Sequence, residues 1–214
     1  MTFIKNKYKR PLLCLLLFSV ISFSFAQGDS EKIRLQLAVG VNNPIDNGKN
    51  DGYFAKDINL PTINFGVRYM FKPNKLGAKL DVGYNRSKSD EGSQKFKLNY
   101  TRVNAQVVYD FNDLLSFLPQ EMSIQAHAGP GVSFTKPLLN DSENTYTYLN
   151  GLIGLEVYYS LSRKLSLFVD VAYAKSFTNK VKYDVVTDGY SFNGDLMYAT
   201  VGLSVALSGC RYCN

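Results

Sequence analysis

Hydrophobic and polar residues alternate along most of the chain from residue 31 onward. This period of two is the pattern of a β-strand with one apolar face and one polar face. The alternating segments are 33–42, 63–71, 76–85, 102–111, 122–134, 149–159, 165–174 and 197–207. Each is about ten residues long or longer, which is the length that a tilted strand needs to cross a bilayer. The pattern therefore predicts an all-β fold of eight strands.

The connections between these segments alternate in length. Tight turns at 72–75 and 162–164 contrast with longer connections that are rich in Gly, Asn, Asp and Ser, at 43–59, 87–94, 136–145 and 179–194. This asymmetry is typical of an up-and-down barrel with short turns on the periplasmic rim and long loops on the outer rim. The connection 112–120 is long and apolar although it lies on the short-turn side, so we expect a short helical turn there, at the membrane rim.

The apolar face could point inward, as in a soluble antiparallel barrel, or outward into lipid. Glycines line the polar set, which suits the crowded interior of a narrow barrel: Gly40, Gly66, Gly77, Gly83, Gly129, Gly131, Gly154 and Gly202. Aromatic residues end the apolar set at two levels, as the girdles of a membrane barrel do: Tyr69, Phe71, Tyr109, Phe111 and Tyr159 at one level, and Tyr84, Phe134 and Tyr173 at the other. We therefore predict an eight-stranded antiparallel up-and-down transmembrane β-barrel.

The first 26 residues have a different character. A basic segment precedes fifteen mostly apolar residues, which end in the small-x-small sequence Ser24-Phe25-Ala26. The apolar run is shorter than the roughly 20 residues of a spanning helix. We expect a cleaved export signal (1–26), a barrel domain (27–209) and a short periplasmic tail (210–214).

Removal of the signal also changes the charge of the chain. The signal contains four of the 24 basic residues, which leaves 20 against 18 acidic residues in the mature chain. This near balance removes the main support for a nucleic-acid-binding role.

Charged residues on the predicted inward face are the main candidates for a site. They are Arg34, Arg68, Lys79, Asp81, Arg102, Asp110, Glu156 and Asp170. The tight turns fix the register of two strand pairs, in which Arg68 faces Lys79 with Asp81 diagonal to it, and Glu156 faces Asp170.

Like charges that face one another on neighbouring strands are unfavourable unless opposite charges lie close by. We therefore predict that Arg34, Arg68 or Arg102 reaches across the lumen to Glu156 and Asp170 and forms a charged plug. A catalytic acid/base pair of Glu156 and Asp170 is disfavoured, because an occluded lumen has no substrate cleft.

His127 is the only histidine, and the alternation places it inward. We expect a hydrogen-bonded interior histidine and no catalytic residue. The alternative is a lipid-modifying enzyme, for which His127 would have to lie beside a Ser and an acid on the lipid-facing surface. The longer connections are where surface contacts would lie, and they carry the aromatic residues Tyr53, Phe54, Tyr183, Tyr190 and Phe192.

No metal or cofactor is expected. Cys210 and Cys213 form a single C-x-x-C, which is too little for a zinc site and favours a local disulfide or an inert tail. The loop 46–52 has the composition of a calcium loop but lacks the distal Glu of an EF-hand.

Two short segments add a family resemblance to the overall pattern. Thr200, Gly202, Val205 and Leu207 resemble the C-terminal β-signal that the barrel-assembly machinery reads, although an aromatic residue is usual at Val205 and the chain continues for seven residues. The segment 129–131 (Gly-Pro-Gly) resembles a fifth strand of the same family. Because its proline has no N–H to donate, we expect a bulge or a local break there.

Over residues 27–207 the chain resembles the small eight-stranded outer-membrane barrels typified by OmpX and the transmembrane domain of OmpA. More narrowly, it resembles the "outer membrane protein beta-barrel domain" proteins of Bacteroidota. The resemblance implies a monomer in the outer membrane of a Gram-negative bacterium, in contact with outer-membrane lipid and lipopolysaccharide. It also implies a non-enzymatic, porin-family role in envelope integrity, surface contact or limited diffusion. The alternatives are a lipid A deacylase-like enzyme and an accessory barrel of a secretion system.

Overall fold

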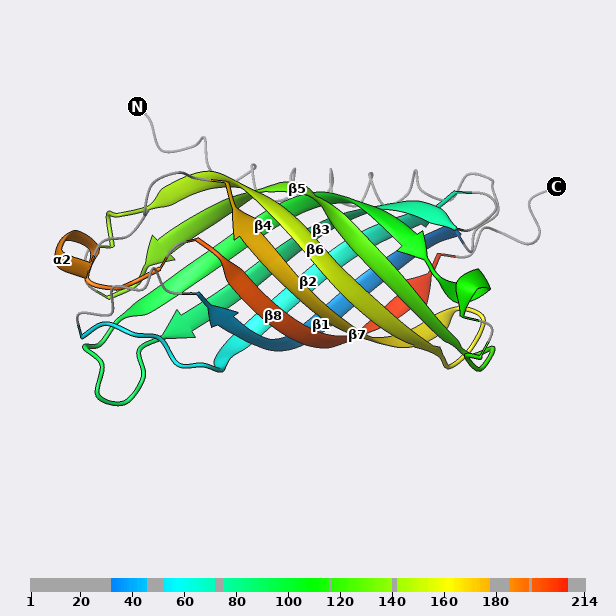
Figure 1. Cartoon of the computed structure of the whole chain (residues 1–214), viewed down its shortest axis with the longest axis horizontal. Helices are drawn as coiled ribbons and strands as arrows, with labels where there is room; N and C mark the ends of the chain where they lie inside the picture. The colour runs from blue at the N-terminus through cyan, green and yellow to red at the C-terminus, as the bar shows by residue number, and fades with distance from the viewer. Residues whose placement is uncertain are drawn as a thin grey trace, which may run out of the picture.

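Eight antiparallel strands close into one barrel in the computed structural model (Figure 1). The structure describes residues 32–45, 52–71, 75–115, 117–139, 142–177, 185–192 and 194–207. The strands are β1 (Ile33–Pro44), β2 (Asn59–Met70), β3 (Leu76–Lys88), β4 (Lys97–Asp110), β5 (Met122–Pro137), β6 (Tyr146–Ser160), β7 (Leu165–Ser176) and β8 (Leu196–Ala206). Each strand pairs with the next in the chain, and β8 pairs with β1. The predicted up-and-down fold is confirmed. The export signal (1–26) and the cysteines Cys210 and Cys213 lie outside the described residues.

Several strands extend further at their outer ends than the alternation predicts. β4 begins at Lys97 rather than at residue 102, because Lys97–Thr101 continue the ladder with β3 up to the pair Lys88–Lys97. β6 begins at Tyr146, where it pairs with Thr135 of β5. The barrel wall therefore rises above the predicted membrane segment on the side of the long loops.

The two faces of the strands divide as predicted, with apolar side chains outward and polar side chains inward. Leu80 and Val107 are exposed on the outer wall, whereas Asn104, Glu156 and their inward neighbours are buried. At the short-turn end, the rings of Tyr69 and Phe71 lie edge to face with their centres 5.4 Å apart, which is a favoured geometry for aromatic pairs.

The connection from β4 to β5 contains a short 3-10 helix, η3 (Asn112–Leu114), which confirms the predicted helical turn. Leu114 and Phe117 are exposed beside it, as expected for side chains at the rim of a bilayer. Nζ of Lys75, in the β2–β3 turn, lies 2.8 Å from Oδ2 of Asp113. The hydrogen bond and the charge of Asp113 raise the pKa of Lys75 above its ordinary value.

Pro130 produces a local break and no bulge. The β4–β5 register is the same on both sides of it, with Asn104 opposite Gly131 and Val107 opposite Ala128, but the two positions between them lack ladder pairs. The β5–β6 ladder continues through Pro130, which pairs with Gly151. In the described ladders, a register shift occurs instead between Gly40 and Asn42 of β1.

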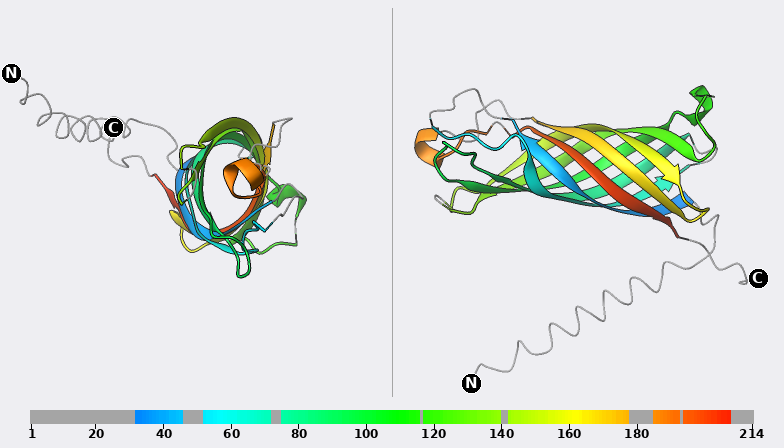
Figure 2. Two further views of the ribbon diagram at one scale, coloured as in Figure 1. Left: turned by 90° about the vertical axis from the view of Figure 1, so that its left-hand side faces the viewer. Right: turned by 90° about the horizontal axis from the view of Figure 1, so that it is seen from below.

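A short helix, α2 (Val185–Asp188), lies in the connection from β7 to β8. Viewed along the barrel axis, it lies over the mouth of the barrel (Figure 2). Among the described residues, no helix is long and apolar enough to cross a membrane.

The outward apolar face generates a depth-dependent prediction. Leu80 lies between the two aromatic levels and pairs with Val67 and Ala105, whereas Leu76 lies beside Tyr109 at the short-turn end. Leu80→Arg should lower the free energy of unfolding in phosphatidylcholine vesicles by about 2–4 kcal/mol, and Leu76→Arg by about 0–1 kcal/mol. Urea-dependent unfolding measures both. Equal costs at the two positions would contradict the assigned membrane depth.

Candidate functional site: the barrel interior

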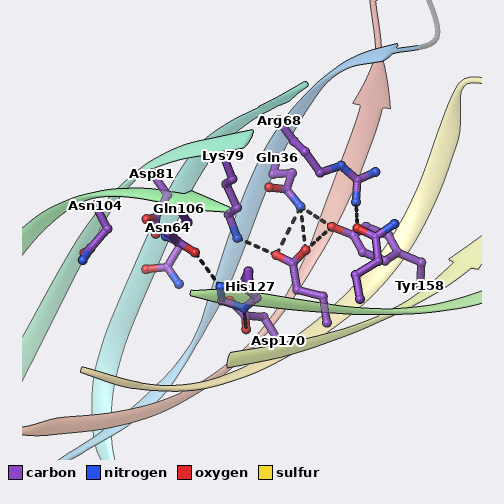
Figure 3. A network of polar contacts seen from close by, with 12 residues as sticks. Gln36, Asn64, Arg68, Lys79, Asp81, Asn104, Gln106, His127, Tyr158 and Asp170 are labelled. Atoms are coloured by element: carbon purple, nitrogen blue, oxygen red, sulfur yellow. Dashed lines mark hydrogen bonds and ion pairs between the residues drawn. The ribbon is translucent and has the colours of Figure 1, made fainter. Parts of the chain in front are cut away.

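The interior contains a buried polar network that connects several strands (Figure 3). At its centre, Glu156 of β6 accepts a hydrogen bond from Lys79 Nζ of β3 at 2.5 Å. Gln36 Nε2 of β1 donates to the same carboxylate at 3.3 Å, and the hydroxyl of Tyr158 donates to its second oxygen. Glu156 is fully buried. Three elements of the wall thus converge on one carboxylate.

A second ion pair lies on β3 and β4. Arg102 Nη1 donates to Asp81 Oδ2 at 2.6 Å, and the same guanidinium donates to Asn64 and Asn104 at 3.2 Å. Its Cζ atom lies 4.5 Å from the centre of the Tyr198 ring, an arrangement that stabilises a buried cation. Because Arg102 is fully buried, these contacts replace its hydration.

His127 of β5 connects Asp170 of β7 to the Arg102–Asp81 ion pair. Its Nδ1 lies 2.5 Å from Oε1 of Gln106, and its Nε2 lies 3.0 Å from Oδ1 of Asp170. Gln106 also donates through Nε2 to Asp81, so one amide links His127 to the Arg102 ion pair. His127 is therefore a hydrogen-bonded interior residue on the lumenal face.

The short-turn side of the network holds Arg34 and Arg68, the two other arginines on the predicted inward face. Arg68 donates to Gln125 and lies with Cζ 4.6 Å from the centre of the Tyr158 ring. Gln125 donates in turn to Asp110 at 2.7 Å. Arg34 lies nearer the rim, where it donates to Ser166 at 3.2 Å.

These contacts correct the predicted pairing. The register is as predicted, with Arg68 opposite Lys79 and Glu156 opposite Asp170. However, the prediction that an arginine bridges Glu156 and Asp170 is wrong, because Lys79 pairs with Glu156 and His127 contacts Asp170. Arg102 is diagonal to Asp81 on the adjacent strand and pairs there instead.

Glycines provide the space for these large side chains. A Cβ atom on Gly83 would lie 2.8 Å from the guanidinium carbon of Arg102, and one on Gly154 would lie 2.5 Å from Nε2 of His127. Real Cβ atoms do not approach other groups so closely. The inward glycines thus allow bulky charged side chains to fit in a narrow lumen.

A cluster of buried apolar side chains lies in the outer half of the lumen, on the long-loop side of the charges. Tyr190 and Phe192, from the connection after α2, are only 2% and 1% exposed. The Tyr190 ring stacks on Phe96 at 5.6 Å, and the Phe192 ring lies edge to face with Tyr100 at 6.1 Å. These residues belong to an apolar cluster of the wall and the loops: Phe96, Leu98, Tyr100, Tyr148, Leu152, Ala172, Ala174, Tyr190, Phe192, Leu196 and Tyr198.

The prediction that Tyr190 and Phe192 lie on an exposed surface loop is therefore wrong. Asp195 fixes the end of this connection, because its carboxylate accepts hydrogen bonds from Tyr173 at 2.6 Å, Lys175 at 2.6 Å and the Ser176 backbone N–H at 2.8 Å. The sequence gives no local signal for this burial, since the segment has a typical loop composition. Tyr183 lies outside the described residues.

Among the residues that the structure describes, His127, Glu156 and Asp170 form a group whose chemistry could bind a metal ion. One ligating atom from each lies within 4.8 Å of the others, and all three side chains are buried. Their ligating atoms already have protein partners, since Lys79 contacts Glu156 and Gln106 contacts His127. The ammonium of Lys79 already supplies a cation to the Glu156 carboxylate.

The fold and this interior define a transmembrane β-barrel whose lumen contains a buried network of charged and polar side chains. The chain matches the family model described as "Outer membrane protein beta-barrel domain" over residues 12–207, and it belongs to that family of outer-membrane proteins. No curated protein matches the chain by sequence.

Solved outer-membrane barrels share the fold. Neisserial surface protein A is 14% identical with a TM-score of 0.58, and the match covers 82% of this chain and 97% of that one. OprG of Pseudomonas aeruginosa is 13% identical with a TM-score of 0.55, covering 83% and 97%. A major outer membrane protein of Thermus thermophilus is 14% identical with a TM-score of 0.55, covering 81% and 98%.

The central ion pair can be tested by a double-mutant cycle. Lys79→Met leaves the Glu156 carboxylate buried without its cation, so the free energy of unfolding should fall by about 3–5 kcal/mol. Because the two residues interact, the double variant Lys79→Met/Glu156→Gln should lose less free energy of unfolding than Lys79→Met and Glu156→Gln lose in sum. Urea-dependent unfolding in vesicles provides the measurement.

Lys75→Met is the matched control, since it removes an exposed lysine–carboxylate pair and should change stability little. If the double variant instead loses as much free energy of unfolding as the two single variants in sum, Lys79 and Glu156 are not energetically coupled.

Proposed function

We propose that the protein is a closed, non-enzymatic outer-membrane barrel that anchors its extracellular loops at the cell surface, with diffusion through its lumen blocked. The observation that carries this proposal is that two layers of buried side chains lie in series along the lumen. The ion pairs Lys79–Glu156 and Arg102–Asp81 form one layer, and the cluster around Tyr190 and Phe192 forms the other.

The two layers oppose permeation for different reasons. A passing ion would have to separate buried ion pairs, and breaking such a pair costs about 3–5 kcal/mol. It would also have to displace the buried rings of Tyr190 and Phe192, which offer an ion no charged group in place of its hydration shell. A barrel filled in this way supports a role in envelope integrity or surface contact better than a role as a porin.

The position of His127 supports a non-enzymatic role. A lipid-modifying site would need the histidine beside a serine and an acid on the lipid-facing wall. His127 is instead buried in the lumen between Gln106 and Asp170. A lipid acyl ester outside the barrel would not reach its ring.

Export and assembly complete the proposal. The signal at 1–26 is cleaved, and the mature chain reaches the outer membrane of a Gram-negative cell, where the assembly machinery reads β8 through Thr200, Gly202, Val205 and Leu207. β8 supports this role because it closes the barrel against β1, with Gly202 opposite Ala38. We take the barrel to be a monomer, and the pairing of β8 with β1 supports this because it leaves no open edge on which a second chain could add a strand.

Conductance across a planar lipid bilayer tests the closed lumen. The refolded protein should insert without stable channel steps, and proteoliposomes should not swell in a sugar solution. The variant Tyr190→Ala/Phe192→Ala should also be silent, because the ion-pair layer remains beneath the removed rings.

Heat-modifiable mobility on a gel serves as the control, since it shows that the silent protein is folded. Recurrent channel steps of uniform size from the unaltered protein would refute the closed-barrel proposal. Steps seen only in the double variant would show that the aromatic layer alone seals the lumen.

A further inference from the structure

The outer wall of β3, β4 and β5 carries a cluster of cations at the extracellular rim. The register places these residues in rows across three neighbouring strands. Arg86 lies opposite Asn99, which lies opposite Lys136, and one step further out Lys88 lies opposite Lys97. We call Arg86, Lys88, Lys97 and Lys136 the rim cations.

The rows below the rim cations show how deep the cluster lies. In the next row toward the membrane, Tyr84 lies opposite Thr101, which lies opposite Phe134. The row after that consists of three valines, Val82, Val103 and Val132. Valines belong in the hydrocarbon, aromatic residues at the interface and cations at the headgroups. The rim cations therefore lie at the level of the headgroups of the outer leaflet.

These side chains point away from the lumen. The residues that alternate with them, Ser87, Leu98 and Thr135, are buried inside the barrel, whereas Lys88 and Lys136 are exposed. No rim cation forms an ion pair with a carboxylate among the residues that the structure describes. Asp90 and Glu91 follow in the β3–β4 loop, beyond the end of β3.

Arg86 is oriented for an external ligand. Its Nε donates to Asn99 Oδ1 at 3.0 Å and its Nη2 donates to the Tyr84 hydroxyl at 2.6 Å. These contacts use one donor each of Nε and Nη2, so the Nη1 donors can take an external acceptor. Lys88 and Lys97 face each other directly, an unfavourable pair of like charges that an anion between them would stabilise.

We propose that the rim cations bind the phosphate groups of lipid A, the phosphorylated glycolipid of the outer leaflet. Bidentate donors and clustered ammonium groups are the chemistry that recognises phosphate in proteins. The lipid's acyl chains would lie along the valine row and against Phe134. The site is on the outer wall, so it does not depend on whether the lumen is closed.

Native mass spectrometry of protein released from phosphatidylcholine nanodiscs tests the site. The nanodiscs also contain either bisphosphorylated lipid A, lipid A from which both phosphates have been removed, or phosphatidylglycerol. The unaltered protein should retain the phosphorylated lipid A, and retention of the dephosphorylated form should be at least about tenfold lower.

The variant Lys97→Gln/Lys136→Gln should lower retention of phosphorylated lipid A by about thirtyfold, because two cationic contacts to phosphate are lost. The matched control Arg163→Gln/Lys164→Gln removes the same charge from the periplasmic β6–β7 turn and should retain the lipid normally. Heat-modifiable gel mobility identifies folded protein. If the double variant does not fold, Lys88→Gln alone, at an exposed strand end, should still lower retention severalfold.

Three results would overturn the proposal. The first is unchanged retention in folded Lys97→Gln/Lys136→Gln or Lys88→Gln. The second is equal retention of lipid A with and without phosphates, or of phosphatidylglycerol and lipid A. The third is preferential binding of a soluble sulfated oligosaccharide, which would assign the rim cations to a polyanionic glycan instead.

Discussion

Closure of the sheet into a narrow barrel is the constraint on which the rest of the structure depends. It pairs the backbone groups of all strands, as a membrane requires, but it also turns one face of every strand into a small interior. A buried charge in such a space costs several kcal/mol unless it has an opposite charge and hydrogen bonds. The contacts of Glu156 and Arg102 are therefore conditions for folding before they have any role in permeation.

The same constraint explains how small and large residues are distributed on the inward face. Arg102 and His127 fill space that Gly83 and Gly154 leave open on neighbouring strands. Tyr158 and Tyr198 each lie against one arginine and contribute a ring rather than a charge. These large charged or polar side chains thus each lie beside a glycine that leaves space for them or beside an aromatic ring that stabilises their charge.

The sequence predicts what depends on period and turn length, namely the strands, their faces and the register of hairpins. Arg68 opposite Lys79 and Glu156 opposite Asp170 follow from counting residues across short turns. The pair Lys79–Glu156 joins β3 and β6, which are not neighbours, so it depends on the tilt and stagger of the whole barrel. The burial of Tyr190 likewise depends on the shape of the mouth, which loop composition does not encode.

The upper end of β4 shows how one strand meets two different requirements. Its inward residues Leu98 and Tyr100 join the apolar cluster in the outer half of the lumen, whereas its outward residues Lys97 and Asn99 belong to the rim. Because Arg102 is paired with Asp81 inside the barrel, the interior charges are not available to an external ligand. Lys97 has no such partner among the described ion pairs. Substitutions at the outward positions can therefore change surface contacts while the inward residues keep the buried contacts on which the fold depends.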